Sequence, residues 1–304
     1  MTAITIIPAS CKTSLATIRA LLSFPDPSIK LTGIYRDLSK VPHDLLSHPQ
    51  FTPLQGDIDD PSLELPPTDL LFHTTPNTYT DADVFDHAKR QTENVKAAIL
   101  KSATVKKVVL MSTMGAQYSS GTGELKANHA AETTISTLPL SIQKVYVRCS
   151  WFMENWASEL PNLLSDKPFF YSTISPADFP FPHIAVRDIG KTCAQELLST
   201  EPPKSNPYIF ELQGRSYSSN DVKKTFEELL GREVEMRVVP KEGLLDYYRQ
   251  AFSEHVAREY TEMNLSFLEG GILHLNPEPT PGGEIRRGET ELKEVLEGLL
   301  QGRV

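Results

Sequence analysis

The chain has 304 residues, of which 39% are hydrophobic and 23% charged, a composition typical of a globular protein with one large domain or two smaller ones. Its formal net charge of −9 argues against nucleic-acid binding, and no apolar run is long enough to span a membrane. The three widely spaced cysteines fit neither a disulfide framework nor a zinc site, so we expect a reduced, cytoplasmic protein without a metal.

The first half of the chain alternates strand-like and helix-like segments. Short apolar runs predict strands at residues 3–7, 30–35, 52–55, 69–75, 107–112 and 141–148. Helical periodicity predicts helices at residues 15–24, 38–48 with a break near Pro42, 82–102 and 125–138. This alternation implies a parallel sheet with helices on both faces, so we assign residues 1–150 to a Rossmann-like, doubly wound dinucleotide-binding domain of the α/β class.

The second half of the chain has a looser pattern. Extended pieces are predicted at residues 169–171, 179–185, 208–212 and 233–239, and helices at 186–199, 218–230, 242–268 and 289–300. Residues 281–288 are predicted to be an exposed loop. We expect residues 186–212 to return to the first domain, and the rest of 151–304 to form a smaller α+β lobe that binds the substrate.

The turn after the first strand has the position of a phosphate-binding loop but not its usual residues. Such a turn is glycine-rich so that the backbone can approach a pyrophosphate closely. Residues 8–14 contain no glycine, and Pro8 lacks an N–H donor. Ser10, Lys12 and Thr13 still offer hydroxyls, a positive charge and helix N-terminal amides. Two interpretations stay open: a lost or altered pyrophosphate site, or NADP(H) bound through these groups.

Two more strand ends supply candidate cofactor contacts. Arg36 follows the second strand, where an arginine can accept the 2′-phosphate of NADP, so NADPH is favoured over NADH if a cofactor binds. Thr74 lies at the end of the fourth strand, and ligands of open α/β sheets bind outside the carboxyl ends of the strands. The alternatives are a solvated turn at Arg36 and a polar strand exit at Thr74.

Several segments together resemble a known family. They are Lys12-Thr13, Gln91 to Val95, Val108 to Ser112, Trp151 to Asn155, Asp188-Ile189 and Leu230-Gly231-Arg232. On these residues the chain resembles the NmrA-like family of atypical short-chain dehydrogenases, and within it the fungal ergot-alkaloid reductases of the festuclavine/agroclavine dehydrogenase type. It departs from that pattern in the glycine loop, at Cys149, where proline usually follows the arginine, and at Thr122, where Tyr-x-x-x-Lys would place its tyrosine.

The resemblance implies roles for several polar residues. It places Asp57 beside the adenine, with a polar turn as the alternative, and it gives Ser112 the orienting role that a serine has in classical relatives. A threonine hydroxyl cannot replace a phenol that titrates, so the acid/base candidates are Tyr118, Lys126 and His129. For Tyr118 and His129 the alternative is a solvated or structural side chain.

Aromatic and polar residues follow the sixth strand. Trp151, Phe152, Met153, Asn155 and Phe170 are candidates for an apolar pocket with a few polar groups, as ligand sites often show. The alternative is core packing between the two parts of the chain.

Three functions fit these observations. The first is an NADPH-dependent reductase that acts on a C=N, C=C or C=O bond of an apolar small molecule in fungal-type specialised metabolism. The second is a cofactor-independent cyclase, isomerase or dehydratase on a degenerate Rossmann scaffold, suggested by the missing glycines. The third is a non-catalytic NADP-sensing regulator, which we rank last because a regulator of that kind should keep a good cofactor loop. Each of these three functions is compatible with a homodimer.

Overall fold

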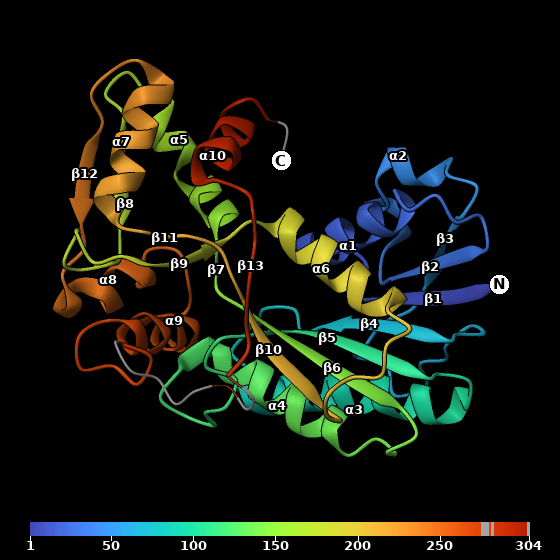
Figure 1. The fold of residues 1–304 in the computed structure, drawn as a ribbon. Helices are drawn as coiled ribbons and strands as arrows, with labels where there is room; N and C mark the ends of the chain where they lie inside the picture. The colour runs from blue at the N-terminus through green and yellow to red at the C-terminus, as the bar shows by residue number, and fades with distance from the viewer. Residues whose placement is uncertain (275–279, 281–282, 303–304) are drawn as a thin grey trace.

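The computed structural model describes residues 1–274, 280 and 283–302, and its main feature is a parallel sheet of eight strands (Figure 1). The strand order is β13-β10-β6-β5-β4-β1-β2-β3. The strands are β1 (Thr2–Ile7), β2 (Ile29–Tyr35), β3 (Phe51–Gln55), β4 (Leu70–Thr74), β5 (Lys107–Thr113), β6 (Gln143–Cys149), β10 (Tyr208–Gln213) and β13 (Ile285–Arg287). Each neighbouring pair in this sheet is parallel, which confirms the predicted Rossmann-like α/β class.

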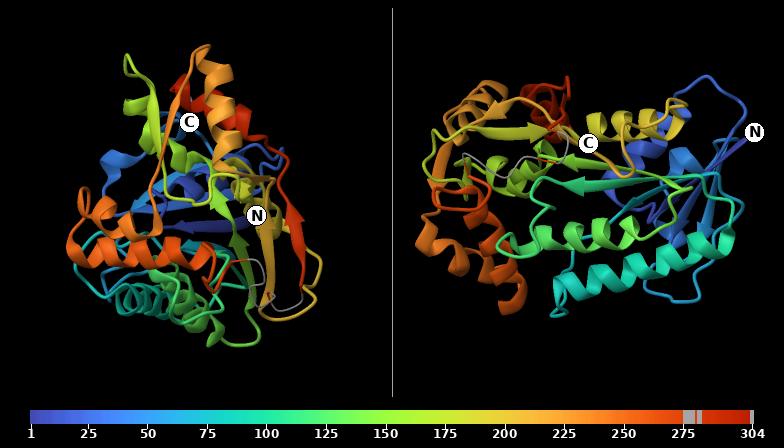
Figure 2. Two further views of the ribbon diagram at one scale, coloured as in Figure 1. Left: turned by 90° about the vertical axis from the view of Figure 1, so that its left-hand side faces the viewer. Right: turned by 60° about the horizontal axis from the view of Figure 1, so that its bottom comes forward.

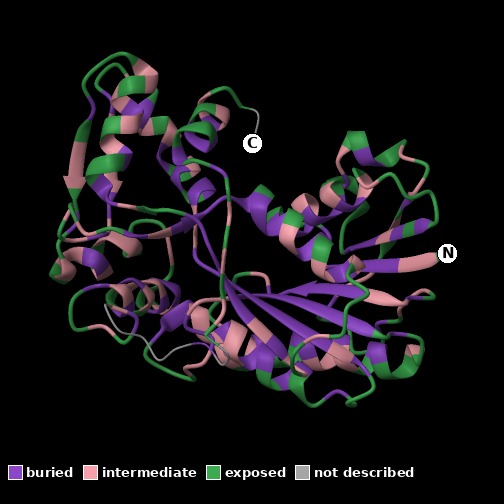
Figure 3. Ribbon diagram, in the orientation of Figure 1, coloured by how far each residue is buried: buried purple, intermediate pink, exposed green. Residues whose placement is uncertain are grey.

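Helices cover both faces of the sheet, and a hydrophobic core lies under each layer (Figures 1 and 2). On one face lie α1 (Lys12–Leu22) and α6 (Val186–Leu198), and on the other lie α3 (Val84–Ser102) and α4 (Lys126–Ser136). The predicted break near Pro42 is confirmed, since η1 (Leu38–Lys40) ends before it and α2 (His43–Leu46) begins after it. The strands are mostly buried (Figure 3), as their apolar, β-branched runs predict.

Gly190 sets the distance between α1 and α6. A Cβ built on Gly190 would stand 2.4 Å from the carbonyl carbon of Ala16 and 2.6 Å from its oxygen. Only a residue without a side chain fits there, because real Cβ atoms do not approach backbone so closely. This contact holds α6, from the second half of the chain, against α1 from the first half.

The rest of the second half forms a smaller lobe beside the carboxyl ends of the strands (Figure 1). Two small sheets, β11-β9-β7 and β12-β8, provide its strands. Its elements in chain order are β7 (Trp151–Phe152), η3 (Met153–Glu159), α5 (Leu160–Leu163), β8 (Phe169–Ser172), β9 (Phe181–Ile184), β11 (Ser216–Tyr217), α7 (Ser219–Leu230), β12 (Glu235–Val238), η4 (Lys241–Gly243), α8 (Leu244–Arg249), α9 (Glu254–Phe267) and α10 (Leu292–Leu300). The predicted α+β character of the lobe is therefore confirmed.

The prediction of a loop at residues 281–288 is wrong in the described part of that segment. Residues 285–287 form β13, in which Ile285, Arg286 and Arg287 pair with Glu211, Leu212 and Gln213 of β10. A short edge strand needs a neighbouring backbone rather than an apolar pattern, and Ile285 is 48% exposed. Nearby prolines and glycines had indicated a loop. Residues 281 and 282 lie outside the described part of the chain.

Candidate functional site

The turn after β1 is closed by its own side chains. The buried Ala9 donates its N–H to the Ile34 carbonyl of β2 at 2.8 Å, and the Ser14 hydroxyl donates to the Pro8 carbonyl at 2.6 Å. These two bonds fix the path between β1 and α1 without glycine. This turn is therefore held in place by packing and by hydrogen bonds. A glycine-rich loop would instead reach its conformation through the backbone freedom of glycine.

The beginning of α1 offers donors for an anion. Cys11 is the N-cap but makes no capping hydrogen bond through its side chain, and the first three amides of α1 donate to no acceptor among the described residues. Ser10 and Lys12 are exposed, and Thr13 is buried. Because free amides at a helix N-terminus attract negative charge, these residues fit a phosphate group at this position.

Arg36 and Asp57 lie at neighbouring strand ends. Arg36 is exposed directly after β2, and the Gly56 amide after β3 donates to the Tyr35 carbonyl at 2.9 Å, which holds the two ends together. The carboxylate of Asp57 accepts from the Asp59 amide at 3.0 Å, as in a polar turn. In the described chain the guanidinium of Arg36 forms no hydrogen bond or ion pair, so it is free to meet an added phosphate.

Ser112 at the end of β5 belongs to a buried polar network. Its hydroxyl donates to Glu132 Oε1 at 2.6 Å. The Glu132 carboxylate also receives Nε and Nη2 of Arg148, at 2.9 and 2.7 Å, in a bidentate pair. The Ser112 hydroxyl is therefore already committed, and its predicted contact with a ligand requires a second hydrogen bond. Thr74, at the end of β4, is buried as well.

The three acid/base candidates have different surroundings. Lys126 Nζ donates to Glu259 Oε1 of α9 at 2.7 Å, and both side chains are largely buried. His129 Nδ1 donates to the Ala116 carbonyl at 2.9 Å, which fixes the orientation of its ring. Tyr118 is half-buried in the loop after β5. Their catalytic roles stay predictions, and Lys126 and His129 each have a structural partner.

Glu124 and Glu259 are two buried acids that the sequence analysis did not single out. Burial raises the pKa of Glu124 to about 7, and the nearby charge of Glu259 acts in the same direction. Glu124 belongs to η2 (Gly123–Leu125), while Glu259 lies far along the chain in α9. No local pattern joins them, because residues 119–129 around Glu124 are mostly polar or glycine and give no sign that its carboxyl is buried.

The aromatic candidates divide between the surface of the lobe and its core. Trp151 and Phe152 are half-buried and Asn155 is exposed, so these three stay predicted substrate contacts. Met153 and Phe170 are completely buried in the core of the lobe. A ligand could touch those two only if the core repacked, so their burial fits the core-packing alternative.

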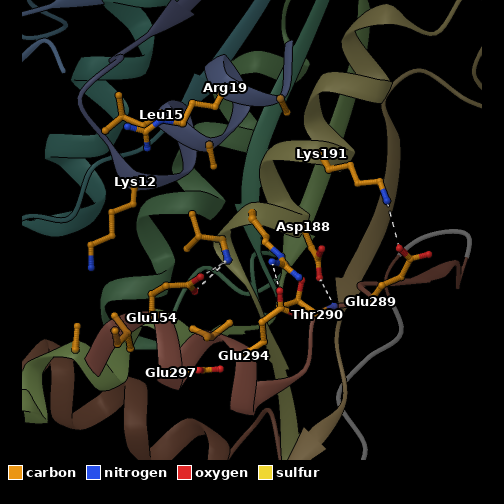
Figure 4. A pocket seen from close by; sticks show the side chains of 18 of the residues that line it. Lys12, Leu15, Arg19, Glu154, Asp188, Lys191, Glu289, Thr290, Glu294 and Glu297 are labelled. Carbon is orange, nitrogen blue, oxygen red and sulfur yellow. Dashed lines mark hydrogen bonds and ion pairs between the residues drawn. The ribbon is translucent and has the colours of Figure 1, made fainter. Parts of the chain in front are cut away.

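A groove of about 1040 Å³ lies between α1, α6, η3 and α10 (Figure 4). Most of its charged side chains are paired, including Arg187 with Glu294 and Lys191 with Glu289. Lys12 lies at one end and stands apart from these pairs in Figure 4. The groove thus adjoins the turn after β1, but its ion pairs leave little net charge for an anion elsewhere along it.

Within residues 1–274, 280 and 283–302, no group of three or more His, Cys, Asp or Glu side chains could hold a metal ion. Over the same residues, none of the helices combines the length and the apolar character needed to cross a bilayer.

The fold defines a Rossmann-like α/β protein with a smaller α+β lobe, and solved structures share this architecture. No family model and no curated protein matches the chain. An NADPH-dependent quinone oxidoreductase from Escherichia coli, solved with NADPH, is 18% identical with a TM-score of 0.69 over 98% of this chain and 99% of its own.

Two further structures extend the comparison. The triphenylmethane reductase of Citrobacter sp., solved with NADP(H), is 15% identical with a TM-score of 0.70 over all of both chains. NmrA, a negative transcriptional regulator, is 17% identical with a TM-score of 0.72 over 99% of this chain and 96% of its own. The chain therefore has the fold that NmrA and these reductases share.

Proposed function

We propose that the protein is an NADPH-dependent reductase of an apolar small molecule. The observation that carries the proposal is the arrangement at the carboxyl ends of β1 and β2, where free amides of α1, the exposed Lys12 and the exposed Arg36 are all available to phosphates. Two similar structures are described as bound to NADPH or NADP(H). NADPH, when bound, supplies a hydride, and the protein supplies binding, orientation and exclusion of water.

The residues near β5 and α4 favour a substrate that needs little acid catalysis. Thr122 occupies the position of the absent tyrosine and is completely buried. Lys126 is held by Glu259. An iminium substrate already carries the positive charge that a phenol acid would otherwise help to generate, so its reduction needs no such acid. We therefore propose a C=N bond as the first substrate class to test, ahead of C=C and C=O bonds, in line with the resemblance to ergot-alkaloid reductases.

The test is a calorimetric titration of the purified protein with NADPH and NADH. Hydrogen bonds to charged groups contribute about 1.5–3 kcal/mol, so Arg36→Ala should weaken NADPH binding by about 10- to 150-fold and leave NADH binding nearly unchanged. Lys224→Ala, which removes an exposed charge from α7, is the control and should change neither. Equal losses for both nucleotides would disprove the 2′-phosphate assignment.

A second candidate is a cofactor-independent cyclase, isomerase or dehydratase. It is favoured by the closed turn, in which Pro8 has no N–H and the Ala9 amide is already bonded to Ile34. Under this alternative, neither nucleotide binds at millimolar concentration, and mutations at Lys12 and Arg36 leave turnover of the true substrate unchanged.

A further inference from the structure

A buried cluster of ionisable side chains joins the lobe to the sheet domain. Lys126 and Glu259 form an ion pair whose side chains are 16% and 10% exposed. Glu124 Oε1 accepts the Thr78 amide at 2.9 Å. The second carboxyl oxygens of Glu124 and Glu259 are both buried and have no hydrogen-bond partner among the described residues. Lys126 thus pairs with Glu259, whereas the buried Glu124 carboxyl forms no ion pair among the described residues.

The charges of this cluster do not balance when both acids are ionised. The pKa of Glu124 is raised to about 7 in all: burial and the charge of Glu259 raise it, and the Thr78 amide and Lys126 lower it. A proton held by Glu124 leaves one carboxylate beside one ammonium group. The other titratable or charged groups on the packed elements are Glu254, His255, Arg258, Tyr260 and Glu262 of α9, His129 and Glu132 of α4, Asp246, Tyr247, Tyr248 and Arg249 of α8, and Tyr79 and Asp81 of the loop after β4.

Helix α9 lies directly against the segments that leave β4 and β5. A Cβ built on Gly123 would stand 2.0 Å from the Glu259 carbonyl oxygen, so the two backbones are in direct contact. On the other side, Asn77 donates to the Tyr260 hydroxyl at 3.0 Å, and Ser253 donates to Asp81 at 2.6 Å. Both segments begin at strand ends where the site is predicted, so α9 covers that side of it.

We propose that α9 is a proton-controlled lid over the carboxyl ends of β4 and β5, closed while the carboxyl group of Glu124 holds a proton beside the Lys126–Glu259 ion pair, and opened more often once Glu124 is ionised. The pKa of Glu124 is raised only in the closed state, and it returns towards its ordinary value of 4.5 when the lid opens to water. The closed state therefore binds the proton more tightly, and closure weakens as the pH rises between these two values. The inference holds whichever ligand the site binds.

Hydrogen exchange of the intact protein measures this opening directly. The pKa of Glu124 is about 7 in the closed state and 4.5 in the open state. With these values, the opening equilibrium constant of residues 254–267 should increase about tenfold from pH 6 to pH 8. This constant is the measured exchange rate divided by the intrinsic exchange rate at the same pH. Glu124→Gln keeps an acceptor for Thr78 but cannot ionise, so its opening equilibrium should change less than about twofold. Glu262→Gln removes an exposed acid from the same helix and should behave as the parent protein does.

Two results would overturn the proposal: an opening equilibrium that does not depend on pH in the parent protein, or a tenfold dependence that survives Glu124→Gln. A carboxyl-carbon NMR titration of the labelled parent protein gives an independent answer if the variant does not fold. A Glu124 midpoint near neutrality supports the lid, and a midpoint at the ordinary glutamate value refutes it. Neither measurement needs cofactor or substrate, so failure of the reductase proposal would leave this test intact.

Discussion

Replacing Arg148 with methionine should be strongly destabilising because it leaves the Glu132 carboxylate buried with the Ser112 hydroxyl as its remaining side-chain donor. The Arg148 and Glu132 side chains are 3% and 8% exposed. Removing one partner of such a pair costs about 3–5 kcal/mol. With an unfolding entropy of about 2.1 cal/mol/K per residue over 304 residues, the melting temperature should fall by about 5–8 °C.

The assay is urea unfolding at pH 8 and pH 5, followed by circular dichroism. Glu132 can escape its unpaired charge by taking up a proton, so the loss caused by Arg148→Met should be smaller at pH 5. The double variant Arg148→Met, Glu132→Met should recover most of it. Arg215→Met, which breaks an exposed pair with Glu291, is the matched control and should cost less than about 1 kcal/mol. Equal losses for Arg148→Met and the control would refute the reasoning.

Three other outcomes are expected. Gly190→Ala forces a Cβ to within 2.4 Å of the Ala16 carbonyl carbon, so thermal unfolding should show a loss of at least about 2 kcal/mol; an unchanged melting temperature would contradict the α1–α6 contact. Burial lowers the pKa of His73 and of His183 to about 4, so the unfolded chain takes up their protons first. The free energy of unfolding should therefore be highest above about pH 6.5 and should fall by about 3 kcal/mol per histidine as the pH drops towards 4. In urea denaturation, His73→Gln should show a weaker dependence of this free energy on pH. Burial raises the pKa of the Cys11 thiol to about 11, so mass spectrometry should find slow alkylation by iodoacetamide at neutral pH, and rapid labelling would show that the turn is open.

The parallel sheet was predictable because its signal is local. Residues 107–112 form an apolar, β-branched run that suits a strand buried on both faces, and β5 is found there. The strand at residues 285–287 was missed because an edge strand needs no apolar pattern, only the free backbone edge of β10. That edge is defined by a segment about seventy residues away in sequence, which local periodicity cannot reveal.

Site residues could be predicted from sequence only where their place at the end of a strand decides whether they face the site. Arg36 follows β2 and is exposed, as expected of a residue at the carboxyl edge of the sheet. The commitment of Lys126 to Glu259 depends on how α9 packs, and a spacing of 133 residues gives no hint of it. Met153 and Phe170 were predicted to line a pocket and instead lie in the core of the lobe. Sequence could not separate these possibilities, because an apolar residue looks the same in the sequence whether it lines a pocket or fills a core.

The segments that connect the sheet to the lobe are joined to one another by backbone hydrogen bonds, and this has a mechanical consequence for the lobe. The chain passes between sheet and lobe near residues 150, 184, 214 and 288, and adjacent crossings are bonded: Ser150 N to Leu212 O, Gly214 N to His183 O, and Gly288 N to Gln213 O, at 3.0, 2.7 and 2.9 Å. Sliding of the lobe along the sheet edge would break these backbone hydrogen bonds. A fifth connection returns the chain from α9 to β13. The lobe therefore cannot be excised or transplanted as one contiguous piece, and an engineer who wishes to exchange it must replace all five connections together.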